Sequence, residues 1–137
     1  MKVDTMNERP ARPQPTPTAL SAPYWEGLAR GELLLQACTR CGTLRHYPRL
    51  LCSACFHDGA RWQRASGAGR IHSWTIAHHA FSPAFADEVP YTLVTVDLEE
   101  GPRALGRWGG DALVIGRGVR ARVVHRDGAQ ELVFDPI

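Results

Sequence analysis

The sequence is poor in lysine: Lys2 is the only one among 137 residues, and it lies close to the N-terminus. Schiff-base catalysis and P-loop phosphate binding both need a lysine in a folded site, so neither chemistry is expected. The chain also lacks an apolar run near the ~18 residues of a membrane-spanning helix. Its polar, proline-rich N-terminus does not resemble a secretory signal, so we expect a cytoplasmic protein without a membrane partner.

An excess of charge of one sign is missing too. Sixteen Lys and Arg residues stand against 14 Asp and Glu, and residues 61–137 contain nine of each kind. Nucleic-acid binders concentrate positive charge, because neutralising backbone phosphates supplies most of their affinity. A nucleic-acid partner is therefore not expected. The 44% hydrophobic and 22% charged residues are typical of a globular domain.

Only four cysteines are present, in two C-x-x-C pairs: Cys38 with Cys41, and Cys52 with Cys55. Each pair predicts a knuckle, and two facing knuckles supply four thiolates for one tetrahedral metal site. Gly42 suits the turn after the first pair. Four thiolates leave no open coordination position, so we expect a structural zinc. Spacing alone does not distinguish zinc from the iron of a rubredoxin-like electron carrier.

Composition divides the chain into four expected segments. They are a disordered proline-rich arm (1–20), an N-terminal helical segment (21–34), a zinc ribbon (35–66) and a β domain (67–137). In the helical segment Ser21 can act as the N-cap, Pro23 suits the first turn, and Gly31 can end the helix. Prolines among Thr, Gln and Arg cannot bury apolar area, which is why the arm is predicted to be disordered.

Alternation and β-branched residues predict five short strands in the β domain, at residues 69–77, 91–98, 103–108, 119–125 and 131–134. Asp127-Gly128 is a hairpin signal between the last two strands. Five short strands in about 70 residues indicate a small closed barrel. The expected fold class is therefore mainly β, with a short helix and a four-cysteine ribbon before the barrel.

The order of several short motifs carries a resemblance to a known family. These motifs are Tyr24-Trp25-Glu26-Gly27, the two knuckles with Tyr47-Pro48-Arg49 between them, Trp74-Thr75, Pro90-Tyr91 and Ile115-Gly116-x-Gly118-Val119. Over residues 21–137 the chain resembles the acyl-CoA-associated OB-fold proteins with a rubredoxin-like N-terminal zinc ribbon, formerly a domain of unknown function. The resemblance implies a five-stranded OB-fold barrel. It also implies an accessory subunit that binds or helps to channel acyl-CoA beside a thiolase-like acyltransferase, thiolase or retro-aldolase.

The residues agree with such a role. A thiolase-type reaction needs a cysteine nucleophile, and all four cysteines of this chain are expected to be metal ligands. No catalytic residue is expected in this chain. Candidate contacts with the partner subunit are the aromatic and histidine side chains of the helix and of the 78–89 loop: Tyr24, Trp25, His78, His79, Phe81 and Phe85. Core packing for the helix aromatics, and acid–base chemistry for the histidines, remain open alternatives.

Four arginines predicted on barrel strands are candidates for binding the phosphates of CoA: Arg103, Arg107, Arg120 and Arg122. A solvated outer face is the alternative for these side chains. Because OB-fold barrels often bind single strands, a nucleic-acid module is the main competing function. Its candidate stacking residues are Trp62, Trp74, Tyr91 and Trp108.

Overall fold

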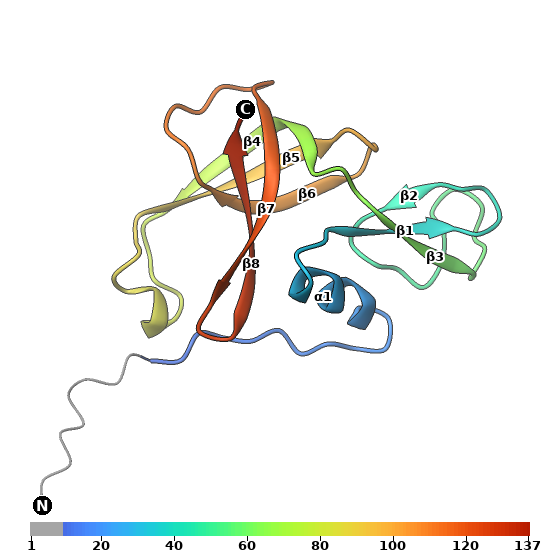
Figure 1. The fold of residues 1–137 in the computed structure, drawn as a ribbon, viewed down its shortest axis with the longest axis horizontal. Coiled ribbons are helices and arrows are strands. Elements are labelled where there is room, and N and C mark those ends of the chain that lie inside the picture. The colour runs from blue at the N-terminus through green and yellow to red at the C-terminus, as the bar shows by residue number, and fades with distance from the viewer. Residues whose placement is uncertain (1–9) are drawn as a thin grey trace, which may run out of the picture.

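A helix, a small sheet and a barrel follow one another along the computed structural model, which describes residues 10–137 (Figure 1). The helix is α1 (Ala22–Ala29), and the small sheet has the order β2-β1-β3, with β1 (Leu34–Cys38), β2 (Leu44–Arg45) and β3 (Ala60–Arg64). The barrel closes in the order β4-β5-β6-β8-β7, with β4 (Ala68–Ala77), β5 (Tyr91–Leu98), β6 (Arg103–Trp108), β7 (Gly118–Arg126) and β8 (Ala129–Pro136). The predicted fold class is confirmed.

Helix α1 begins and ends close to the expected residues, but its predicted cap is wrong. The Ser21 side chain makes no capping hydrogen bond; its Oγ instead accepts from the backbone N–H of Thr18 at 2.9 Å. Gly31 ends the helix with φ +79, a conformation that costs glycine little. Tyr24 and Leu28 face inward and are buried. In the described residues no helix combines the length and apolar character needed to cross a membrane.

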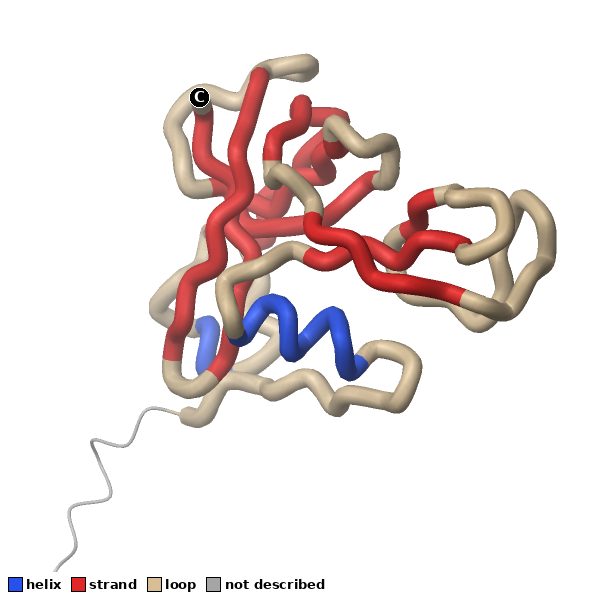
Figure 2. The backbone as a smooth tube through the Cα atoms, turned by 45° about the vertical axis from the view of Figure 1, so that its right-hand side comes forward, coloured by secondary structure: helices blue, strands red, loops and turns tan. Residues whose placement is uncertain are grey.

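The small sheet is built around β1, which is the central strand and is buried from its second residue onward. Leu35 of β1 belongs to the same hydrophobic cluster as Leu28 of α1 and the barrel residues Leu98 and Phe134. This shared cluster joins helix, sheet and barrel into one packed unit, with α1 beside the base of the ribbon (Figure 2). Strand β3 was not predicted, because Trp62 is the only large apolar residue in its sequence Ala-Arg-Trp-Gln-Arg.

The barrel strands agree with the predicted ranges, and β5 and β6 match at both ends. Inward-facing residues of the strands fill the interior, among them Ile71, Val94 and Val119. Closure depends on a short parallel contact between β6 and β8, with only Arg107 and Trp108 in register with β8 residues. Gly106 lies next to this contact, where an added Cβ would come within 2.8 Å of the Phe134 ring.

Where the structure describes it, the N-terminal arm contacts the barrel. Pro10–Leu20 form no helix or strand, yet the Arg12 side chain is only 10% exposed and pairs with Glu88. Gln14 also donates to the backbone carbonyl of Asp127 at 3.4 Å. This part of the arm therefore runs along the base of the barrel. The remainder of the predicted arm, residues 1–9, lies outside the described residues.

The close approach at Gly106 generates a prediction about barrel closure. Gly106→Ala should lower the free energy of unfolding by about 1–3 kcal/mol, because its methyl group overpacks the Phe134 ring. Gly118→Ala is the matched control, since the nearest atom to its added Cβ is 3.9 Å away. Thermal unfolding of both variants measures the difference, and equal melting temperatures would contradict this view of the closure.

Candidate functional site

The four cysteines meet at the end of the small sheet. Their sulfur atoms lie within 4.8 Å of one another, with Cys38 and Cys55 3.5 Å apart and Cys41 and Cys52 3.6 Å apart. A tetrahedral ion with metal–sulfur bonds of about 2.3 Å requires sulfur–sulfur edges of about 3.8 Å. The spacing is too long for disulfides, whose sulfurs lie about 2.05 Å apart. The cluster therefore fits a closed, structural metal site.

Backbone donors support the thiolates in the same way in both knuckles. The N–H of Arg40 donates to Cys38 Sγ, and the N–H of Ala54 donates to Cys52 Sγ, each at 3.4 Å. Such hydrogen bonds orient the ligands and reduce the negative charge on sulfur. Two pseudo-equivalent knuckles thus face a common centre.

Four sulfurs at this distance cannot all ionise easily without a cation. A hydrogen bond with the Thr43 hydroxyl lowers the pKa of Cys41 to about 6. The N–H of His57 lowers the pKa of Cys55, but burial and the neighbouring sulfurs outweigh it and raise that pKa to about 11. A bound dication removes this conflict, because it stabilises every thiolate at once.

The knuckles differ in the residue that follows each pair of cysteines. Gly42 donates its N–H to the Cys38 carbonyl and has φ +76; Phe56 donates to the Cys52 carbonyl and has φ +63. Both positions therefore need the left-handed conformation, which glycine adopts freely and a bulky residue does not. The Phe56 side chain is nevertheless 75% exposed.

A second group of polar side chains gathers at the base of the barrel around Glu88. Its carboxylate accepts from Arg107 at 2.6 Å and from Arg126 at 3.2 Å, and it also pairs with Arg12 of the arm. Arg107 bridges onward to Glu131 at 2.9 Å. Burial by itself raises the pKa of Glu88, but the hydrogen bonds from Arg107 and Arg12 outweigh it and hold the pKa below its usual range.

The six candidate partner-contact residues divide between core and surface. Tyr24 is 7% exposed and belongs to the hydrophobic core, so its assignment to a partner surface is corrected: its ring is already buried by this chain. Trp25 packs edge-on against Tyr24, with ring centroids 4.9 Å apart. Phe85 lies beneath the Arg12 guanidinium, 5.1 Å from its ring centroid, and is half-buried.

The remaining three lie on the surface of the 78–89 loop. His78 and His79 are both exposed, and Phe81 is 82% exposed. The edge of the Phe81 ring contacts His79, with centroids 4.9 Å apart. The exposed Phe81 ring therefore lies on the same loop as Phe85, which the arm covers. The six candidate residues do not form one patch.

The four candidate arginines do not converge. Three already pair with carboxylates: Arg103 with Asp97, Arg107 with Glu88 and Glu131, and Arg122 with Asp135. Arg120 is exposed and makes no ion pair with any residue between 10 and 137. A phosphate would have to displace a carboxylate from the first three, whereas Arg120 is available.

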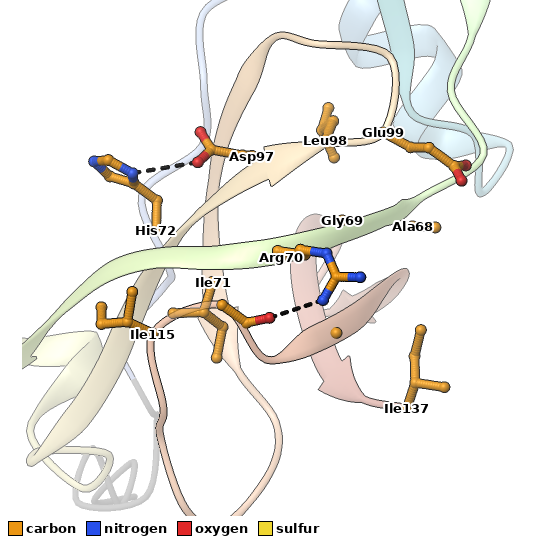
Figure 3. Close-up of a pocket in the computed structure, with 12 residues that line it drawn as sticks. Ala68, Gly69, Arg70, Ile71, His72, Asp97, Leu98, Glu99, Ile115 and Ile137 are labelled. Carbon is orange, nitrogen blue, oxygen red and sulfur yellow. Dashed lines mark hydrogen bonds and ion pairs between the residues drawn. The ribbon is translucent and has the colours of Figure 1, made fainter.

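Sequence reasoning missed a cavity of about 600 Å³ beside the barrel (Figure 3). Apolar side chains from separate segments line it, among them Leu98, Ile115 and Ile137. Arg70 lies at its edge, where it donates to the Gly116 carbonyl at 3.1 Å. These residues share no local motif, so only the closed barrel reveals that they are neighbours.

The candidate stacking residues do not form one platform. Trp62 and Trp108 pack against the hydrophobic core, and Tyr91 lies beneath the Arg107 guanidinium at 4.4 Å. Trp74 is the most open of them, at 39% exposure. This dispersion, together with the balanced charge of the barrel, does not favour a single-strand-binding surface.

The cysteine geometry predicts a metal-dependent fold. Cys52→Ser should lose the metal and unfold the ribbon, because one missing ligand opens the coordination shell. Ser53→Ala, at the neighbouring exposed position, should retain both the metal and the fold. Elemental analysis with circular dichroism measures each variant, and a metal-free wild-type protein that is folded would contradict the prediction.

Two family descriptions match consecutive parts of the chain. Residues 25–60 match "ChsH2, rubredoxin-like zinc ribbon domain", and residues 62–126 match "ChsH2, C-terminal OB-fold domain". The first covers the four cysteines, and the second covers most of the barrel.

Curated relatives and a solved structure agree with these matches. A probable enoyl-CoA hydratase alpha subunit of Thermomonospora curvata is 35% identical over 74% of this chain and 32% of its own length. A DUF35 domain-containing scaffold protein of Methanothermobacter thermautotrophicus is 36% identical over 48% of this chain and 50% of its own length. The chain thus spans only a third to a half of these relatives.

The solved structure titled "Ltp2-ChsH2(DUF35) aldolase" contains a chain that superposes with a TM-score of 0.81 at 31% identity, covering 90% of this chain and 98% of that one. The match extends across ribbon and barrel together, which agrees with the shared core. The chain therefore belongs to the DUF35 family, whose ChsH2-type members join a rubredoxin-like zinc ribbon to an OB-fold domain.

Proposed function

We propose that this chain is a non-catalytic accessory subunit of a heteromeric complex that acts on CoA thioesters, with a thiolase-like protein as its catalytic partner. The cysteine cluster carries the proposal. All four cysteines of the sequence lie within 4.8 Å of one another in one site, so no thiol remains for acyl transfer. A thiolase-type reaction needs an activated cysteine, which the partner subunit would supply.

The names of the matched proteins support the same class of assembly. They describe a probable enoyl-CoA hydratase alpha subunit, a DUF35 domain-containing scaffold protein and an Ltp2-ChsH2 aldolase. The first name includes a CoA thioester and a subunit, and the third places a second protein, Ltp2, beside ChsH2. A chain that supplies a rigid ribbon and barrel, without a catalytic thiol, suits the accessory position in such a complex.

We assign the partner contact to residues 1–31 together with the 78–89 loop. The ion pair between Arg12 and Glu88 supports this assignment, because it holds the described part of the arm against that loop. Phe81 offers an exposed aromatic anchor of the kind that contributes most at interfaces. Trp25 and Phe85 lie under the arm and would support the contact from beneath.

We assign the CoA contact to Arg120 and to the cavity beside the barrel. Arg120 pairs in register with Ala68, which lines that cavity, and Arg70 lies two residues further along β4. Neither arginine makes an ion pair with another residue of the described chain. Their positive charge is therefore available for phosphate, while the apolar lining suits an acyl or pantetheine chain.

We assign zinc to the cysteine site. The site has no open ligand position, and an accessory role needs no redox chemistry. When bound, zinc would supply cross-linking of the two knuckles and no reactive group. Purified protein should contain one zinc per chain and be colourless, whereas a red protein with visible absorption would identify a rubredoxin-like iron centre.

Co-expression with a thiolase-like protein from the same organism tests the assembly. A stable complex should form and act on acyl-CoA, the isolated chain should be inert, and Phe81→Ala should weaken the complex. If the two proteins elute separately at micromolar concentration and the thiolase-like protein is fully active alone, the proposal is wrong. Turnover by the isolated chain that is lost on His78→Ala or His79→Ala would also contradict it.

The CoA assignment predicts a difference between two arginines of one strand. In the assembled complex, Arg120→Ala should raise KM for the acyl-CoA roughly tenfold, the loss expected for one charge-assisted hydrogen bond. Arg122→Ala should change KM much less, because Asp135 already neutralises that side chain. Equal KM values for both variants would contradict the assignment.

A further inference from the structure

The ribbon tip carries a large apolar patch that the fold does not use. Three side chains beside the second knuckle are exposed: Leu50 at 71%, Leu51 at 48% and Phe56 at 75%. We call them the ribbon tip patch. Leu51 directly precedes Cys52, and the N–H of Phe56 donates to the Cys52 carbonyl at 2.9 Å, so these side chains surround the second knuckle. The ribbon that carries this knuckle projects away from the barrel (Figure 1).

Phe56 is unfavourable for this chain on two separate grounds. Its backbone has φ +63, a left-handed conformation. The equivalent position in the first knuckle, Gly42, is a glycine, which adopts this conformation without strain. Its ring is mostly in water, so the fold gains little apolar burial from it. A residue that is both strained and exposed is expected where an interaction outside the fold requires it.

The charge around the patch indicates the chemistry of its occupant. The ribbon, residues 35–66, contains five arginines and one acidic residue, Asp58. Three exposed arginines near the knuckles make no ion pair within residues 10–137: Arg40, Arg49 and Arg61. Arg64 is exposed too, but it is in register with Leu34 at the other end of β1. In the barrel segment, by contrast, five of seven arginines pair with carboxylates of the chain itself.

We propose that the ribbon tip patch docks on the catalytic subunit of the complex, with Phe56 entering an apolar pocket that acidic side chains surround. The unpaired arginines would meet those carboxylates, and the two leucines would cover the pocket rim. This inference rests on the proposed accessory function and adds a second contact, separate from the 78–89 loop. Aliphatic leucines suit a protein pocket better than nucleic-acid bases, which stack on aromatic faces.

Phe56→Gly separates docking from folding. Glycine removes the ring and also suits φ +63, so the variant should keep its metal and show an unchanged or higher melting temperature. Its affinity for the co-expressed thiolase-like protein should fall at least about 30-fold, the effect of losing an aromatic hot spot. Arg49→Glu should also weaken binding and flatten its salt dependence, since only the backbone of Arg49 bonds within the ribbon.

Phe81→Ala serves as the comparison, because it removes an equally exposed ring at the other proposed contact. If wild-type protein forms no complex, the proposed function fails and this inference fails with it. If wild type and Phe56→Gly bind equally while Phe81→Ala binds weakly, only the ribbon tip inference is overturned. Loss of metal in Phe56→Gly would show a structural role instead, and salt-dependent binding of single-stranded RNA that needs Phe56 would reassign the patch.

Discussion

The four-thiolate cluster is the constraint on which the rest of the ribbon depends. From residue 39 to residue 64 only Arg45 and Cys52 are buried, so this stretch has almost no hydrophobic core of its own. Hydrogen bonds from Arg45 and from the Arg49 N–H to Gln36 fix the connecting loop at one end. A metal on the cysteines must hold the other end, because apolar burial cannot.

That constraint turns the ribbon into a rigid extension of the barrel. The base of the ribbon shares the hydrophobic cluster of α1 and the barrel, so the position of the metal site is set relative to the barrel wall. The two parts also differ in charge pairing. Carboxylates of the chain neutralise most barrel arginines, whereas the exposed ribbon arginines have no carboxylate partner within the described residues. This distribution of charge agrees with the accessory role proposed above.

Much of this organisation could be predicted from local pattern. The C-x-x-C pairs predicted the cluster, and β-branched alternation predicted β5 and β6 at their observed ends. Features that depend on tertiary contacts could not be predicted in this way. Strand β3 forms because it pairs with the edge of β1 through backbone hydrogen bonds. The cavity near Ile115 forms only where segments distant in the sequence come together. Burial of Tyr24 likewise depends on where the helix packs, which its sequence does not specify.

The central claim is that this chain assembles with a catalytic subunit while its own cysteines hold only a metal. Native mass spectrometry of the co-expressed pair tests it most directly, because a single spectrum reports both the subunits and the bound ions. The account predicts a heteromeric complex with one zinc for each copy of this chain. A chain that stays separate from the thiolase-like protein, or that carries no metal while folded, would contradict it.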